Sequence, residues 1–163
     1  TATGEGGTDT TLGFDMLHVV PKQSAPDWIK SSPLSTGDAN GYVDVDKHTL
    51  QHVRYPNVFA LGDAGSTPNS KTGAAIRKQA PVVVANVSAM LNGQPLPARY
   101  DGYASCPIVT SSRDMLLAEF DYDFELKPSF PLLDPTKPNR AYWYLKRHGL
   151  PALYWHLMLK GLA

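Results

Sequence analysis

The sequence predicts an α/β fold, of α+β character with mixed strands when this chain is taken alone, and two observations support that prediction. Short apolar runs rich in β-branched residues are closed by Pro or Gly, as strands are. One of these runs leads into a long stretch whose apolar residues have helical spacing. With 163 residues, 42% of them hydrophobic, the chain is long enough to form a real core.

The first part of the chain contains three expected strands. Residues 13–20 form an apolar run of the kind found in buried strands of parallel sheets. A short helix is expected over residues 25–31. Residues 41–46 alternate apolar and polar side chains, which predicts a strand exposed on one face, and residues 47–51 supply a turn. Residues 57–65 then predict a buried strand that ends in a Gly-Asp turn.

A long helix is expected over residues 72–92. Pro81 should kink or interrupt it, and Gly93 fits its C-terminal stop. Residues 97–103 are expected to form a linker. The apolar stripe of the helix is expected to contain Ala74, Ala75, Ile76, Val83, Val84, Val87, Met90 and Leu91.

The last third begins with a predicted hairpin, in which residues 107–110 and 115–121 flank a turn at 111–114. Residues 125–139 carry four prolines and should be irregular. Residues 140–163 are expected to form a C-terminal helix pair, separated near residues 149–151.

The tail has the composition of helices that lie at a membrane surface, because aromatic and aliphatic residues alternate with basic ones. Each apolar run is shorter than the ~20 residues needed to cross a bilayer. We therefore expect a peripheral membrane contact through residues 140–163, on a side that the sequence does not specify. The alternative is a helix pair packed on the protein's own core or on a partner subunit.

Composition excludes several classes of protein. Fifteen basic and fifteen acidic side chains balance, so no nucleic-acid partner is expected. A single cysteine excludes an internal disulfide, and the five histidines show no metal-ligand spacing, so no metal site is expected. Residues 1–8 are expected to be a polar loop rather than a signal peptide. Because the last residues, 157–163, are mostly apolar, we expect that the chain is part of a longer protein.

The strongest local pattern is residues 55–64. A buried strand presents Asp63 beside Gly62, where a ligand could approach the backbone closely. Lys71 and Thr72 then open the helix, whose N-terminus offers free N–H groups and partial positive charge. An Asp accepts hydrogen bonds from sugar-like hydroxyls, and a helix N-terminus with a lysine stabilises charge on a ring carbonyl. The pattern suits a flavin, although a plain strand-to-helix turn would also explain a Gly-Asp pair. The expected cofactor-binding residues are Gly62, Asp63, Ala64, Lys71 and Thr72.

This pattern resembles the second flavin-contacting motif of the two-dinucleotide-binding-domain flavoproteins, the pyridine nucleotide-disulfide oxidoreductase superfamily, and residues 41–51 match the strand pair that precedes it. Over residues 12–163 the chain is similar to sulfide:quinone oxidoreductases, in the branch that includes the mitochondrial enzyme. The resemblance lies in residues 15–21, 70–72, 100–107, 117–122 and 153–161.

The resemblance implies FAD as cofactor, sulfide and a quinone as substrates, and Cys106 as one of two redox cysteines. In the family's mechanism sulfide attacks a disulfide or trisulfide between the two cysteines, the released thiolate reduces the flavin, and a quinone reoxidises it. From its sequence context alone, Cys106 is either a small buried hydrophobe or a thiol presented by a tight segment between a linker and a strand.

Two family features are absent from this sequence: the second cysteine and the Gly-x-Gly-x-x-Gly fingerprint. Both belong to the family's N-terminal region, so we expect a C-terminal part that is inactive alone. Residues 1–57 would end the second dinucleotide-binding-like domain, residues 58–97 would return to the FAD-binding domain, and residues 98–163 would form the sulfide, quinone and membrane region. A homodimer would cover surfaces that the missing segments leave exposed.

Three alternatives remain open. The chain could come from a quinone-linked NADH dehydrogenase or from another FAD-dependent enzyme of the disulfide-reductase superfamily. It could also be a non-catalytic structural or interaction module. Cys106 favours the sulfide-oxidising enzyme, because the other enzymes do not need a cysteine at this place.

Overall fold

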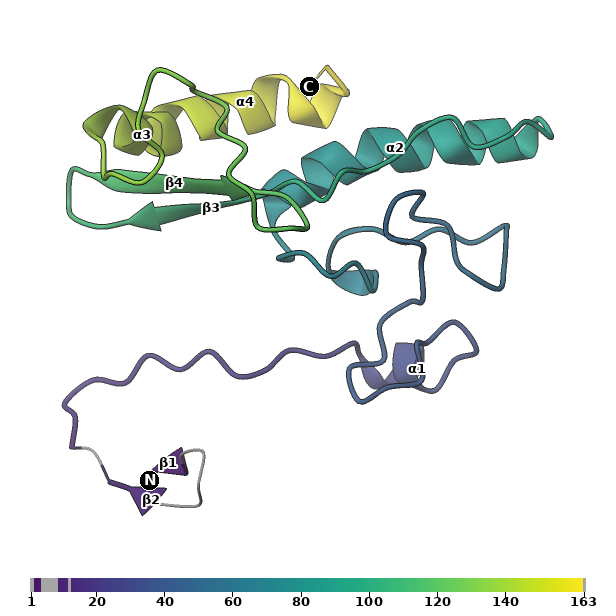
Figure 1. The fold of residues 1–163 in the computed structure, drawn as a ribbon, viewed down its shortest axis with the longest axis horizontal. Helices are drawn as coiled ribbons and strands as arrows, with labels where there is room; N and C mark the ends of the chain where they lie inside the picture. The colour runs from purple at the N-terminus through teal and green to yellow at the C-terminus, as the bar shows by residue number, and fades with distance from the viewer. Residues whose placement is uncertain (1, 4–8, 12, 163) are drawn as a thin grey trace.

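The computed structural model describes residues 2–3, 9–11 and 13–162. Its elements are mixed helices and short strands, which agrees with the coarse α+β prediction (Figure 1). They are β1 (Ala2–Thr3), β2 (Asp9–Thr10), α1 (Asp27–Lys30), the 3-10 turn η1 (Gly62–Ala64), α2 (Gly73–Leu91), β3 (Ala104–Val109), β4 (Met115–Phe120), α3 (Arg140–Tyr144), the π-helical segment η2 (Leu145–Gly149), α4 (Leu150–His156) and the 3-10 turn η3 (Met158–Lys160).

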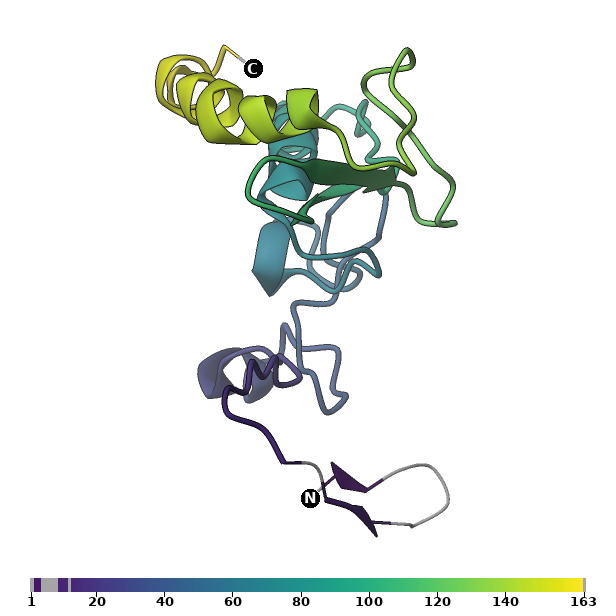
Figure 2. The same cartoon turned by 90° about the vertical axis from the view of Figure 1, so that its left-hand side faces the viewer.

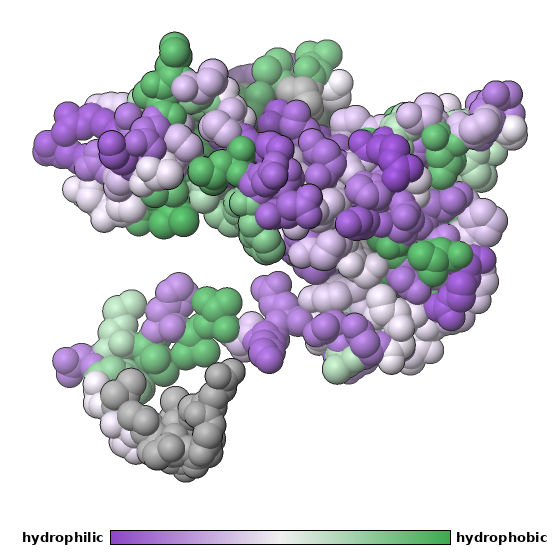
Figure 3. Space-filling view, viewed as in Figure 1, coloured by the Kyte–Doolittle hydropathy of each residue, from purple (hydrophilic) through white to green (hydrophobic). Residues whose placement is uncertain are grey.

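The N-terminal segment differs from the prediction. β1 pairs antiparallel with β2, while residues 1 and 4–8 of the predicted polar loop lie outside the described residues. The buried strand predicted over residues 13–20 is wrong: this stretch is extended and unpaired, and Met16 and Val20 are 86% and 76% exposed. A parallel-sheet strand is stable only beside neighbours that bond its edges and cover its faces. No such neighbour lies in the described part of the chain, and the segment carries apolar surface (Figure 3).

A network of isolated β-bridges organises residues 35–65. Val43 bridges both Ser35 and Gly65, and Val45 bridges His52. The predicted alternation over residues 41–46 is confirmed, because Val43 and Val45 are buried whereas Tyr42 and Asp44 are half-buried, but the segment forms isolated bridges and not a regular strand. Helix α1 and a turn at residues 47–49 also lie where they were predicted.

The strand predicted over residues 57–65 is only partly formed. Phe59 bridges Gln51, the chain from Val58 to Leu61 is extended and half-buried, and it ends in the η1 turn. Its prediction as a fully buried strand is therefore wrong, because residues 58–61 are half-buried and form only the one isolated bridge.

Helix α2 confirms the predicted long helix, including both ends. The Thr72 hydroxyl accepts the N–H of Ala75 at 3.2 Å, which caps the N-terminus. Gly93 has φ +65° and donates its N–H to the carbonyl of Met90, and the next residue closes a wider turn onto Ala89. The helix is continuous through Pro81, so no break occurs there.

The apolar stripe predicted for α2 is wrong in three of its eight members, Ile76, Val84 and Leu91, which are exposed, whereas Ala75 is buried and the other four are half-buried. The buried positions are Ala75, Gln79, Val82 and Asn86, whereas Val84 and Leu91 are 69% and 74% exposed. The buried face of α2 packs against backbone N–H and C=O groups of other segments. Such groups need hydrogen-bond partners when they are buried. The Asn86 amide meets that need: it donates to the carbonyls of Thr49 and Ala98 and accepts the Ala98 N–H, at 2.9–3.0 Å.

The predicted linker over residues 97–103 has no helix or strand, but part of it packs closely. Tyr100 is 2% exposed and forms a core cluster with Leu50 and Val82. This cluster joins all three regions into which the sequence was divided. The three regions therefore share a core cluster and do not have fully separate cores.

The C-terminal third is a hairpin covered by a helix (Figures 1 and 2). The predicted hairpin is confirmed: β3 and β4 pair antiparallel from Ala104–Phe120 to Val109–Met115. Residues 125–139 contain only turns, bends and two isolated bridges, at Leu126 and Asn139, and are irregular as predicted. Met115 and Leu117 pack against Tyr142 of α3.

The predicted helix pair is wrong, because α3, η2 and α4 follow one another without a break from residue 140 to residue 156. Pro151 lacks the N–H that an α-helix would use and would clash with the preceding turn. The wider π-helical register of η2 just before it allows the helix to pass that point. None of the helices in the described ranges is long and apolar enough to cross a membrane.

Candidate functional site

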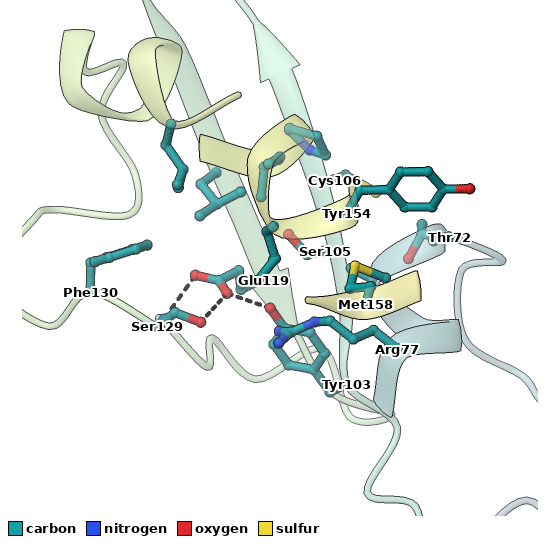
Figure 4. A pocket seen from close by; sticks show the side chains of 17 residues that line it. Thr72, Arg77, Tyr103, Ser105, Cys106, Glu119, Ser129, Phe130, Tyr154 and Met158 are labelled. Carbon is teal, nitrogen blue, oxygen red and sulfur yellow. Dashed lines mark hydrogen bonds between the residues drawn. The ribbon is translucent and has the colours of Figure 1, made fainter. Parts of the chain in front are cut away.

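A pocket of about 780 Å³ lies between the start of α2, the β3–β4 hairpin and the C-terminal helix (Figure 4). Its walls are mostly apolar, with Leu145, Leu150 and Leu153 contributed by the C-terminal helix. A pocket of this size and composition is typical of sites for small organic ligands.

The N-terminus of α2 forms one end of the pocket. Thr72, Gly73 and Ala74 line it. The first N–H groups of a helix have no intrahelical partner, and the Thr72 side chain caps only that of Ala75. The helix therefore offers free donors and partial positive charge to a ligand in the pocket.

Four of the predicted flavin-contacting residues lie outside the pocket lining, on and after the η1 turn. Gly62 has φ +61°, its N–H donates to Gln79 Oε1 at 2.7 Å, and a Cβ there would meet Ile76 at 3.0 Å. Asp63 is exposed. Ala64, half-buried, accepts the N–H of Val43 at 2.9 Å.

Lys71 is tied to the same turn. Its ammonium donates to the Gly65 carbonyl and lies 4.1 Å from the centroid of the Tyr42 ring. Burial lowers the pKa of Lys71, and the charge of Asp63 opposes that effect. Asp63 therefore lies close enough to Lys71 for its charge to act on the ammonium.

Cys106 lines the pocket, but not in the setting that was predicted. It is the third residue of β3, half-buried, rather than part of a tight segment that precedes the strand. Because residues opposite each other in a hairpin share a face, Cys106 and Ala118 lie on one face and the Ser105–Glu119 pair on the other. Of the predicted residues, the fold thus brings Thr72 and Cys106 to one pocket.

The sequence reasoning missed three polar residues of the pocket, Tyr103, Glu119 and Ser129. Glu119 is 2% exposed and accepts hydrogen bonds from the other two side chains (Figure 4). A signal was present, because Glu119 continues the period-2 series of Met115 and Leu117, which places a carboxyl group on the buried face of its strand.

A second, smaller pocket of about 350 Å³ lies beside the hairpin turn. Three arginines reach it from two elements: Arg113 from the turn, and Arg140 and Arg147 from the C-terminal helix. Trp143 completes its wall, with the Arg147 guanidinium 5.1 Å from its ring centroid. Its lining contains no carboxylate, so it attracts anions.

The chain is similar to curated mitochondrial sulfide:quinone oxidoreductases. It is 50% identical to that of Dictyostelium discoideum over 151 residues, 43% identical to that of Mus musculus over 155 residues and 44% identical to that of Schizosaccharomyces pombe over 152 residues. These matches include 91–95% of this chain and 33–34% of each relative. The chain thus spans about a third of the length of the curated relatives it matches. No protein-family model matches it.

Two further similarities are more distant. An FAD-dependent oxidoreductase of Flammulina velutipes is 33% identical over 75 residues, which are 46% of this chain and 23% of that protein. A chain in the cryo-EM structure of the Tetrahymena thermophila mitochondrial ATP synthase superposes with a TM-score of 0.68 at 29% identity. That match covers 81% of this chain and 31% of the other.

The curated proteins that this chain resembles are all oxidoreductases, and the similarity assigns the chain to that class. Within it, the chain corresponds to a segment of the sulfide:quinone oxidoreductase family, and the resemblance identified from its motifs is confirmed.

Proposed function

We propose that this chain is the C-terminal part of a flavoprotein that oxidises sulfide to sulfane sulfur and passes the electrons through FAD to a quinone. The observation that carries the proposal is the pocket where the start of α2 and Cys106 meet. It combines a sulfur nucleophile with a positive helix terminus, the two features that the chemistry needs. The longer protein of which this chain is a segment is called the parent protein below.

The residues around η1 and the start of α2 fit FAD. Gly62 has a left-handed backbone that disfavours other residues, the exposed Asp63 carboxylate can accept hydroxyl hydrogen bonds, and Ala64 continues the turn. Lys71 and the N-terminus of α2, which Thr72 caps, would supply positive charge to a ring carbonyl. When bound, FAD would supply the two-electron carrier between sulfur and quinone.

Cys106 is the sulfur-handling residue in this proposal. It is the only cysteine of the chain, so its disulfide partner must come from elsewhere in the parent protein. Its half-buried position on β3 leaves the thiol open to the pocket wall while limiting access of water. The residues of this chain thus bind and orient the sulfur atom, and the apolar helix wall excludes solvent.

The N-terminal region of the parent protein is the first partner that we infer. Phe14, Met16, Leu17, Val19 and Val20 are 58–86% exposed on an extended segment. Such a run of apolar side chains is stable only when covered. In this proposal residues 1–57 end the second dinucleotide-binding-like domain, residues 58–97 belong to the FAD-binding domain, and residues 98–163 complete the active region.

The membrane is the second inferred partner. The three arginines of the smaller pocket stand beside Tyr144, which is 55% exposed, and Trp155 further along the same helix is 63% exposed. This arrangement favours peripheral contact with anionic headgroups, where a quinone would be available. A homodimer formed over the exposed apolar residues is the competing use of this surface.

The test is the visible spectrum of the purified parent protein. We expect a flavin absorbance that bleaches on adding sulfide and recovers on adding a quinone. Cys106→Ser should keep the flavin but lose at least about 10²-fold in the bleaching rate, because the nucleophile is removed. Thr110→Ser, a small change at the end of the same hairpin, is the matched control. Bleaching by NADH but not by sulfide would instead assign the protein to a quinone-linked NADH dehydrogenase.

A further inference from the structure

Lys71 carries a half-buried ammonium group just before the start of α2. None of the ion pairs in the described part of the chain includes it. Among the described residues its Nζ atom donates one hydrogen bond, to the Gly65 carbonyl, whereas an ammonium group has three donors. Burial lowers the pKa of Lys71, and the charge of Asp63 opposes this effect only in part. Donors of a charged group are therefore left for a ligand at this place.

The ring of Tyr42 also holds this ammonium. The Nζ atom of Lys71 lies 4.1 Å from the centroid of the ring, within the reach of a cation–π contact. The face of the ring makes the contact, so the contact depends on the aromatic ring and not on the hydroxyl. Contacts of this kind change equilibria by factors of about 2 to 30, and the effect increases as water is excluded.

Backbone hydrogen bonds fix Tyr42 beside the loop that leads to α2. The Tyr42 carbonyl accepts the Thr36 N–H at 2.9 Å. The next residue, Val43, forms a parallel bridge with Gly65 through two hydrogen bonds of 2.9 Å. The Tyr42 side chain also packs against a buried core cluster. The ring and the carbonyl that hold Lys71 are therefore kept together by the same backbone bridge.

We propose that Tyr42 is a positioning residue that holds the charged ammonium of Lys71 in place for the flavin, an inference that rests on the proposed function. The ring and the Gly65 carbonyl occupy part of the ammonium and leave a donor for a ring carbonyl of the cofactor. A fixed positive charge beside a ring that gains electrons favours the reduced form, because the charge is already in place when the electrons arrive. Tyr42 thus acts on electron transfer through Lys71.

A purely structural use of Lys71 does not explain the aromatic ring. The hydrogen bond from Lys71 to the Gly65 carbonyl closes the loop between them whether or not a ring lies beside the ammonium. Burying a charge without an opposite charge costs free energy, which a purely structural link does not require. A ligand with electron-rich oxygen atoms offsets that cost. The first turn of α2, which begins at Gly73, offers free N–H groups to the same ligand.

The first measurement follows acylation of Lys71 in the parent protein by an amine reagent, quantified by peptide mass spectrometry in samples of equal flavin content. Only an uncharged amine reacts, so the rate reports how strongly the surroundings hold the ammonium charge. We expect Tyr42→Leu to raise the rate about threefold to tenfold, since it removes the cation–π contact. Tyr42→Phe keeps the ring and should react as wild type does. Lys78, exposed on α2, is the internal reference and should react equally in all samples.

The second measurement is the midpoint reduction potential of the bound flavin in the same proteins. We expect Tyr42→Leu to lower it by about 14–30 mV, which is a threefold to tenfold change in a two-electron equilibrium. Tyr42→Phe should leave the potential unchanged. Lys71→Met removes the charge and should lower the potential at least as much, and adding Tyr42→Leu to it should have little further effect. A purely structural role of the ring would lower the melting temperature without moving the potential.

Two results would overturn the inference alone: an unchanged acylation rate in Tyr42→Leu, or an unchanged potential despite a faster acylation. If Tyr42→Leu fails to fold, a fluorinated phenylalanine at this position keeps the shape of the ring and weakens its negative face. It should change the acylation rate and the potential in the same directions, and no change in either would again overturn the inference. Absence of flavin from the wild-type parent protein would overturn the proposed function and the inference together.

Discussion

The backbone N–H of Gly62 donates to the side-chain oxygen Oε1 of Gln79 at 2.7 Å, inside the protein. Gln79 is 1% exposed and lies on the second turn of α2, so this bond locks the Gly-Asp turn to the helix that follows it. The two parts of the candidate cofactor site are thereby held at a fixed separation.

We expect Gln79→Leu to lower the free energy of unfolding of the parent protein by about 1–3 kcal/mol, because it leaves the Gly62 N–H buried and unpaired. The variant should also lose bound flavin more readily than wild type. Chemical unfolding and flavin absorbance after gel filtration measure the two effects. Gln94→Leu, which changes an exposed glutamine after the same helix, is the control and should change neither.

Gln79 also shows where sequence reasoning reaches its limit. The extent of α2, its Thr72 cap and its Gly93 stop could be predicted, because each depends on residues within one or two helical turns. The buried face could not, since it is decided by segments distant in sequence. Thr49 and Ala98 supply the backbone groups that make Asn86 the buried residue where Val84 was expected.

The same distinction applies to the candidate site. The Gly-Asp turn and Cys106 were found because local motifs carry them. Glu119 was missed, because its role depends on Ser129 and Tyr103, which lie 10 and 16 residues away. The strand predicted over residues 13–20 failed for a related reason, since its pairing partners are not in the described part of this chain.

The buried phenol of Tyr100 should make the stability of the protein depend on pH in the alkaline range. Burial raises its pKa to about 12, from 10.0 for a free tyrosine. A group whose pKa is raised by folding contributes stability that is fully present below its unfolded pKa and is lost as pH rises through its folded pKa. We therefore expect the melting temperature to fall as pH increases from 10 to about 12.

Tyr100→Phe should weaken that alkaline fall while lowering stability at neutral pH, because the phenol donates to the Tyr103 carbonyl and accepts from Asn69. Melting temperatures from pH 7 upward measure both effects. Tyr144→Phe is the control, because Tyr144 is 55% exposed. An identical alkaline fall in wild type and Tyr100→Phe would show that another group causes it.

The arginine pocket predicts an electrostatic membrane contact. Replacing Arg113, Arg140 and Arg147 by Gln should weaken binding of the parent protein to vesicles that contain anionic lipid by about 10²-fold, since each basic residue near such a surface contributes about 1 kcal/mol. Sedimentation with vesicles measures the effect, and added salt should reduce wild-type binding.

A control triple variant removes the same charge elsewhere, at the exposed residues Lys22, Lys47 and Arg99. It should bind vesicles as wild type does. Equal loss in both triple variants would show that net charge, and not the arginine pocket, governs binding. If the variant without the three arginines no longer binds inorganic phosphate but still binds vesicles, the pocket is a site for a free anion.

At Tyr142 we expect a substitution that does not destabilise the parent protein. Its ring is 1% exposed and packs on Met115 and Leu117, but its hydroxyl is buried with no hydrogen-bond partner among the described residues. A buried unpaired hydroxyl costs free energy, so Tyr142→Phe should leave the stability of the parent protein unchanged or raise it by up to about 1 kcal/mol. Tyr142→Ala removes the ring and should cost about 3–5 kcal/mol. Chemical unfolding of both variants separates ring from hydroxyl. A loss above 1 kcal/mol in Tyr142→Phe would show instead that the parent protein supplies a partner for the hydroxyl, and would place another segment of it against α3.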